Sequence, residues 1–297
     1  MKRIFPLFIL VVILTPLCSL YVEASLEEGD VLHYKVISSK FSAQYGSNAI
    51  STRKFNFNNQ TYSARTKIDV TVNFFSSGFN GNYSIGENQD KRGYTDWMLE
   101  AVLTAYIYYS SLFITNMLIA WELVDFEDGF PLILYPYVEP VSSSWEYLES
   151  LGGSIVDSFH LYQDAGQPVS ADYIFKDKDT RIYFESRTKG TTTNEVQANN
   201  PHYLPANFSF DNHFQVSYDK TTGVLLGMHM RGVTKGYVND QFAKVMLNYQ
   251  IEKTAYSLPI FTLSKRYIVL LILVPVGSIG LIAGSAVLVI SIIRKKR

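Results

Sequence analysis

Residues 214–228 read FQVSYDKTTGVLLGM, and this stretch predicts an antiparallel hairpin. Its two ends, 214–218 and 224–228, are rich in aromatic and aliphatic residues, as strands are. Between them, Asp219 can close a turn with its side chain, and Gly223 can take the left-handed backbone conformation that ends a turn. The stretch therefore indicates a fold built on antiparallel sheet.

Alternation of apolar and polar residues predicts further strands on both sides of this hairpin. One strand begins at 31–36, and a period of two runs through 62–74. Residues 182–185 and 245–251 show the same period. The segment 76–93 is rich in Gly, Asn and Ser, so it predicts turns and short edge strands.

Two segments between the strands predict helices. Residues 97–121 are almost wholly apolar or hydroxyl-bearing and follow Asp96, a good N-cap. The polar side chains spread through this segment favour a buried helix, or a helix followed by a strand, over a membrane span. A shorter helix is predicted from a capping box at 143–146 to a stop at Gly152 and Gly153. The predicted fold class is α+β and β-rich, with a curved antiparallel sheet packed on a central apolar helix.

The C-terminal region predicts one transmembrane helix. Residues 268–293 carry no charge and would form a helix of about 39 Å, longer than the ~30 Å hydrocarbon core of a bilayer. Lys265 and Arg266 precede this run, and the sequence RKKR follows it at 294–297. Because cationic flanks favour the cytoplasmic side, we expect a membrane helix over 265–293 and a cytoplasmic tail at 294–297.

The N-terminal region predicts a secretory signal peptide. Lys2 and Arg3 precede an apolar run at 4–20, and a cleavage site of the A-x-A type ends at Ala24. An uncleaved signal anchor is the alternative. With cleavage after residue 24, residues 25–264 form an extracytoplasmic domain of a single-pass cell-membrane protein. The only cysteine, Cys18, falls within the signal, so this domain has no disulfides.

The charge of the extracytoplasmic domain argues against nucleic acid as a partner. Residues 25–264 contain 18 basic and 26 acidic residues. No Lys or Arg lies between Arg92 and Lys176, and this stretch holds a candidate Ca²⁺ site at Asp125, Glu127 and Asp128, because hard cations prefer oxygen ligands. The spacing fits no EF-hand loop. A solvated acidic face balanced by basic strands at 176–189 is the simpler interpretation.

Three further groups of residues are candidate sites. An apolar ligand cavity between sheet and helix would be lined by Tyr106, Tyr109, Phe113 and Met117, although core packing explains these residues equally. Sequons for N-glycosylation begin at Asn59, Asn82 and Asn207. In the membrane helix, Gly277, Gly280 and Gly284 permit close pairing of two helices, and hence a homodimer, although relief of packing around Pro275 explains these glycines equally.

Two short motifs resemble an uncharacterised archaeal family of surface proteins. The motifs are GDVLHYKV at 29–36 and YDKTTGVLLG at 218–227. Members of that family combine a signal peptide, a β-rich ectodomain and a C-terminal anchor of the choice-of-anchor type. The resemblance implies an anchored extracytoplasmic protein, and it implies no catalytic residue or cofactor.

The sequence favours a non-enzymatic surface protein that binds a protein partner or an apolar, lipid-like ligand. It has no G-x-S-x-G elbow, Walker loop or histidine spacing of a zinc site in the extracytoplasmic domain. Because a dispersed triad leaves no local motif, an anchored extracytoplasmic hydrolase is one alternative. A structural envelope component is the other.

Overall fold

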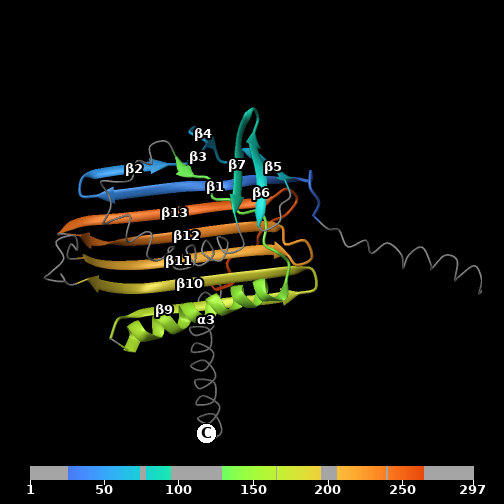
Figure 1. Ribbon diagram of the computed structural model, residues 1–297. Helices are drawn as coiled ribbons and strands as arrows, with labels where there is room; N and C mark the ends of the chain where they lie inside the picture. Colours follow the sequence, from blue (N-terminus) through green and yellow to red (C-terminus); the bar gives the residue numbers. More distant parts are fainter. Residues whose placement is uncertain are drawn as a thin grey trace, which may run out of the picture.

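The computed structural model describes residues 26–73, 78–94, 129–164, 166–194, 206–238 and 240–263. Their main feature is an antiparallel sheet of ten strands with one long helix against one face (Figure 1). The strand order is β7 (Asn88–Tyr94), β6 (Phe79–Ile85), β5 (Lys67–Asn73), β1 (Val31–Tyr45), β13 (Gln241–Lys253), β12 (Leu225–Val238), β11 (Ala206–Asp219), β10 (Arg181–Asn194) and β9 (Val169–Lys178). A tenth strand, β2 (Asn48–Thr52), pairs with the end of β1. The predicted β-rich antiparallel fold is thus confirmed.

The hairpin at 214–228 forms as predicted and joins β11 to β12. The side chain of Asp219 accepts hydrogen bonds from the backbone N–H groups of Thr221 and Thr222, at 3.1 and 2.8 Å. Gly223 has a φ of +69°, and a side chain there would collide with the carbonyl of Val138. This turn therefore requires glycine for its backbone angle and for space.

The alternating stretch at 62–74 divides into two strands instead of one. Ile68, Val70 and Val72 of β5 are buried as expected, but Arg65 has a φ of +75° and turns the chain before them. Tyr62 belongs to β4 (Gln60–Ser63), which pairs with β3 (Lys54–Phe57) in a second, three-stranded sheet completed by β8 (Phe130–Pro131). The alternation of apolar and polar residues happens to continue across the turn at Arg65, so the sequence pattern does not reveal that one strand ends and another begins there.

The segment predicted as turns and short edges forms the regular hairpin β6–β7. It pairs with β5 and extends one end of the large sheet. Phe79, Tyr83 and Ile85 of β6 are buried, and Gly81 leaves room for the ring of Phe79. Some of the glycine and asparagine residues that predict turns therefore lie within closely packed strands.

One face of the large sheet, here called the core face, buries the apolar side chains of the strands. It carries Val245, Leu247, Tyr249 and Ile251 of β13, as the sequence predicted for a last alternating strand. The extended segment 129–138 is fixed to this face by three buried tyrosine hydroxyls. Tyr34 donates to the carbonyls of Leu225 and Pro136, Tyr83 to that of Leu134, and Tyr249 to that of Ile133.

Helix α3 (Ser142–Asp164) packs on the β9 end of the sheet and is longer than predicted. The helix does not stop at Gly152 and Gly153 but passes through both. A side chain at Gly152 would overlap the ring of Tyr173 on β9, whereas Gly153 faces open space. Gly152 is therefore a packing residue, and the helix stop inferred from the glycine pair is wrong.

Several predicted segments lie outside the described residues. These are the signal peptide at 1–24, the apolar helix at 97–121, the membrane helix at 265–293 and the tail at 294–297. Within the described ranges, no helix has the length and apolar character needed to cross a bilayer.

Candidate functional site

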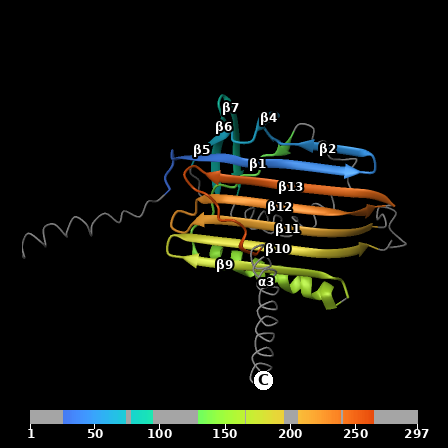
Figure 2. The ribbon, with the colours of Figure 1, turned by 180° about the vertical axis from the view of Figure 1, so that it is seen from behind.

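The last ten described residues, 254–263, here called the strap, leave β13 and cross the face of the sheet opposite the core (Figure 2). This opposite face is here called the outer face. Leu258 of the strap is buried and lies against Gly227 of β12. The ring of Phe261 lies against the imidazoles of His213 and His229, with centroids 4.9 and 4.6 Å away. The strap is thus part of the folded domain.

Glu185 of β10 holds the end of the strap through its carboxylate. The side chain is fully buried, and its oxygens accept the backbone N–H groups of Thr262 at 2.9 Å and Leu263 at 2.7 Å. The hydroxyl of Tyr183 donates a third hydrogen bond, of 2.6 Å, to the same carboxylate. A buried carboxylate requires such donors, because an unpaired charge out of water is costly.

Two more polar side chains under the strap complete this attachment. Gln215 donates from Nε2 to the carbonyl of Pro259 at 2.8 Å and to the Tyr183 hydroxyl at 3.0 Å. Glu252 accepts the backbone N–H of Leu258 at 2.9 Å. Burial is the main cause that raises the pKa of Tyr183, and the hydrogen bond to Glu185 raises it further. The phenol therefore keeps its proton and remains a donor.

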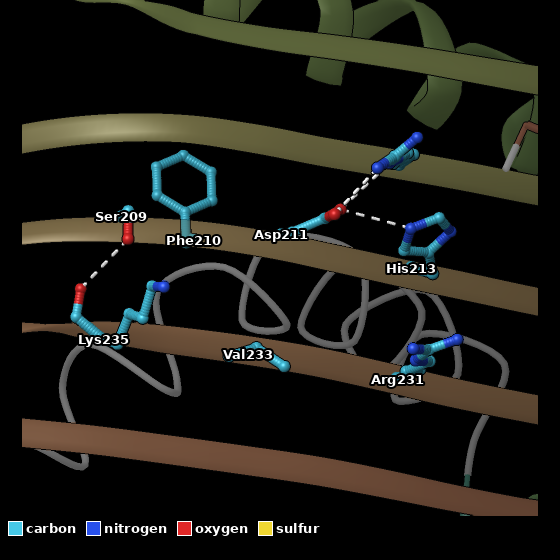
Figure 3. A pocket seen from close by; sticks show the side chains of 8 residues that line it. Ser209, Phe210, Asp211, His213, Arg231, Val233 and Lys235 are labelled. Atoms are coloured by element: carbon cyan, nitrogen blue, oxygen red, sulfur yellow. Dashed lines mark hydrogen bonds and ion pairs between the residues drawn. The ribbon is translucent and has the colours of Figure 1, made fainter. Parts of the chain in front are cut away.

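An open groove of about 440 Å³ lies on the outer face beside the strap, and we call it the β11–β12 groove. Figure 3 shows its lining side chains on neighbouring strands. The lining consists of Arg187 on β10, Ser209, Phe210, Asp211 and His213 on β11, and Arg231, Val233 and Lys235 on β12. Three cations and one carboxylate therefore share this groove.

Asp211 is committed to partners inside the groove. Its two oxygens accept from Nε and one terminal nitrogen of Arg187 at 2.9 and 2.7 Å, and Nε2 of His213 lies 3.2 Å away. Burial raises the pKa of Asp211, but the hydrogen bonds from His213 and Arg187 and the guanidinium charge outweigh that effect. The net pKa lies well below the usual aspartate value, so Asp211 stays ionised and balances only one of the cations.

Ser209, Asp211 and His213 stand on one strand, but their order does not make a catalytic triad. In a triad the histidine stands between the nucleophile and the carboxylate. Here Asp211 stands between the other two, and four residues of strand separate Ser209 from His213 by about 13 Å. Ser209 instead donates to the carbonyl of Lys235 at 3.3 Å. The arrangement suits anion binding better than nucleophilic attack.

A second basic groove of about 390 Å³ lies on the other side of the strap, and we call it the β9–β10 groove. It is lined by Lys176, Lys178 and Arg181 together with residues of the strap such as Tyr256. The ammonium of Lys176 lies 5.3 Å from the ring centre of Tyr183, and the guanidinium of Arg181 lies 5.8 Å from that of Tyr256. These cation–π contacts keep both cations on the outer face.

The charge of the described domain is divided between its two sides. Register with the groove residues places further cations on the outer face, namely Lys35, Lys40, Lys189 and Lys244. Helix α3, on the opposite side, has no Lys or Arg and exposes Glu146, Glu149, Asp157 and Asp164. The net negative charge of the domain thus hides a basic outer face.

Most residues predicted as sites lie outside the described ranges. This holds for the cavity residues Tyr106, Tyr109, Phe113 and Met117, the acidic cluster Asp125, Glu127 and Asp128, and the glycines Gly277, Gly280 and Gly284. Within the described residues, no group of three or more His, Cys, Asp or Glu side chains is placed to hold a metal ion.

The three sequon asparagines lie at different places on the sheets. Asn59 is exposed in the β3–β4 turn with a φ of +58°, and Asn82 is half-buried on β6. Asn207 is exposed on β11 and pairs with Tyr237 of β12. Asn59 and Asn207 are thus both exposed, and of the three only Asn59 is a turn residue in the left-handed conformation.

Sequence reasoning missed the strap, Glu185 and the grooves. The alternation at 182–185 predicts a strand, but in that pattern Glu185 reads as an ordinary solvent-facing residue. The sequence also predicts basic strands at 176–189, but their neighbours Arg231 and Lys235 come from a strand more than forty residues later. Only strand order brings these cations together.

The described residues thus form an antiparallel-sheet domain with a basic outer face, across which the strap at 254–263 is bound. No protein-family model matches the chain, and no curated protein sequence matches it.

Proposed function

We propose that the chain is a single-span, non-enzymatic membrane protein whose domain lies outside the cell and binds an anionic group through the grooves of its outer face. The groups that would bind such a ligand are Arg187, Arg231 and Lys235 on one side of the strap and Lys176, Lys178 and Arg181 on the other. Carboxylate, phosphate and sulfate groups match this chemistry, since guanidinium groups bind them in a fork.

The observation that carries the proposal is the attachment of Leu263 to the outer face. The strap is bound to the outer face by Glu185, and its last residue, Leu263, precedes the predicted membrane run at 268–293 by only four residues. A membrane helix at 268–293 would therefore begin close to the face that carries both grooves. Because the strap is attached to the sheet just before the anchor, the position of the membrane limits where the domain can lie.

A polyanion-binding experiment on the full chain in detergent micelles tests the binding part of this proposal. Fluorescent dextran sulfate is the probe, and uncharged dextran is the comparison. We expect the sulfated probe to bind and Arg231→Glu combined with Lys235→Glu to weaken its binding at least tenfold, with a steep dependence on salt.

The matched control reverses the same charge elsewhere. Arg53 and Lys54 are exposed at the start of the small sheet, away from both grooves. Arg53→Glu combined with Lys54→Glu changes the net charge equally, and binding should fall much less. Equal losses in the two double variants would mean that net charge, and not the grooves, binds the probe.

A further inference from the structure

We infer that the anionic group bound by the outer face is the lipid headgroup, and that the domain lies with this face against the bilayer in which it is anchored. The inference rests on the proposed anchor and names the ligand of the same two grooves. Three independent features of the outer face support it: its distance from the anchor, its charge and its exposed apolar side chains.

The length of the connecting chain limits how far the outer face can lie from the membrane. Five residue steps lead from Leu263 to residue 268, and a fully extended chain covers about 18 Å over that length. The hydrogen bonds to Glu185 fix Leu263 on the outer face. This face is therefore held near the headgroups, while α3 lies on the far side of the sheet (Figures 1 and 2).

Charge separation then favours one orientation over the others. The outer face presents cations on both sides of the strap, whereas the charged side chains that α3 exposes are carboxylates, beside His160 and the exposed Leu161 and Tyr162. An anionic membrane surface attracts nearby Lys and Arg side chains and repels carboxylates within roughly a Debye length, about 8–10 Å. Both effects turn the outer face toward the lipid.

Exposed apolar side chains stand at two places on the same face. Ile260 of the strap is 73% exposed, and Tyr237 and Phe242 are 57% and 36% exposed at the paired ends of β12 and β13. The Tyr237 and Phe242 rings contact each other at 5.9 Å, beside the paired Lys235 and Lys244. Aromatic rings next to cations are typical of surfaces that settle at the level of lipid headgroups.

Energy transfer to labelled lipid headgroups tests the orientation with the full chain. Cys18 is the only cysteine of the chain, so in a Cys18→Ser background a single dye can be placed at Ser42→Cys on the outer face of β1 or at Ser154→Cys on α3. The protein is reconstituted in liposomes of phosphatidylcholine alone or mixed with phosphatidylglycerol. In the anionic liposomes we expect markedly greater transfer from position 42 than from position 154.

Charge reversal supplies the decisive comparison. Arg231→Glu combined with Lys235→Glu should remove the excess transfer from position 42, and Arg53→Glu combined with Lys54→Glu should leave it. Equal transfer from the two dye positions in anionic liposomes would overturn the orientation. So would undiminished binding of dextran sulfate to the chain in those liposomes, because the grooves would then be open to a soluble partner.

These outcomes separate the failure of this inference from that of the anchor. If the chain remains in the bilayer and binds dextran sulfate in micelles, but energy transfer from the two dye positions is equal, only the proposed orientation is refuted. If liposomes do not retain the chain, the proposed anchor is refuted as well.

Glycosylation at Asn207 gives an independent test. Asn207 pairs with Tyr237 on the outer face, so a glycan there would hold this face away from the lipid. Glycopeptide mass spectrometry of protein from its native membrane should find Asn207 unmodified, whatever the state of Asn59. A glycan on Asn207 in most molecules would contradict the inference.

Discussion

The carboxylate of Glu185 accepts a 2.7 Å hydrogen bond from the backbone N–H of Leu263, although 78 positions separate the two residues. The same carboxylate binds Thr262 and Tyr183, and its side chain is fully buried. The strap supplies donors that the buried carboxylate needs, and the carboxylate supplies the acceptor for the backbone N–H groups of Thr262 and Leu263. Sheet and strap therefore depend on each other at this point.

Replacing the Glu185 carboxylate should loosen the strap. Glu185→Gln keeps the shape but turns one acceptor oxygen into a donor that faces other donors, and a hydrogen bond to a charged group contributes about 1.5–3 kcal/mol. We expect chymotryptic cleavage after Tyr256 or Phe261 to become at least tenfold faster under native conditions. Glu146→Gln, at an exposed position of α3, is the control. Cleavage of the Glu185 variant at the wild-type rate would show that the carboxylate does not hold the strap.

The two adjacent glycines of α3 should respond oppositely to alanine. A methyl group at Gly152 would overlap the ring of Tyr173, whereas one at Gly153 meets nothing within 4 Å. Gly153→Ala should stabilise the protein by about 0.5–1 kcal/mol through helix propensity. Gly152→Ala should destabilise it by about 1–3 kcal/mol through overpacking. Urea unfolding in detergent measures both, and stabilisation by both substitutions would mean that α3 does not pack closely on β9.

His229 should make the fold less stable in mild acid. Burial is the main cause that lowers the pKa of His229 from 6.5, with smaller effects from Arg231 and His213, while its hydrogen bond to Asn248 opposes them. The unfolded chain therefore binds a proton more readily, so this contribution to stability is complete above pH 6.5 and is lost as the pH falls below that value. The depressed pKa of Asp211 acts only in stronger acid, below about pH 4.

The pH dependence is measured as the free energy of unfolding at pH 7.5 and 5.0. His229→Gln keeps a donor for Asn248 and should reduce the loss between the two pH values. His160→Gln, at an exposed position of α3, should leave that loss unchanged. If the wild type and both variants lose the same free energy of unfolding between pH 7.5 and 5.0, His229 is not the source of the pH dependence.

The hydroxyl of Tyr249 should be important for attaching the segment 129–138. It donates to the carbonyl of Ile133 at 3.0 Å and accepts from its N–H at 3.3 Å. Tyr249→Phe leaves both partly buried backbone groups of Ile133 without this partner, and we expect a cost of about 1–3 kcal/mol in the free energy of unfolding. Tyr162→Phe, at a position 58% exposed on α3, should cost less than about 0.5 kcal/mol. Equal costs would show that the hydroxyl contact is unimportant.

Local chemistry made much of the sheet predictable from the sequence. In the turn at 219–223, Asp219 accepts the backbone N–H groups and Gly223 takes the left-handed conformation, as expected. Tyr249 and its alternating neighbours are buried because a half-buried strand has a period of two whatever its partners are. These properties belong to segments of a few residues, so a single sequence reveals them.

The site depended on contacts that no local pattern records. Gly152 reads as a helix stop unless Tyr173 is known to lie against it, and Glu185 reads as a surface residue unless the strap is known to cover it. Arg187 and Arg231 become neighbours only through the order of β10, β11 and β12. Tertiary pairing, which a single sequence leaves open, determines each of these roles.

The central claim, that residues 268–293 anchor the domain outside the cell, is tested most directly by protease treatment of intact cells followed by alkaline carbonate extraction. The account predicts that protease removes the domain from intact cells and leaves a short membrane-bound fragment that contains the tail at 294–297, and that carbonate fails to release the untreated chain. Release of the full chain by carbonate, or a domain that protease reaches only after the cells are broken, would contradict it.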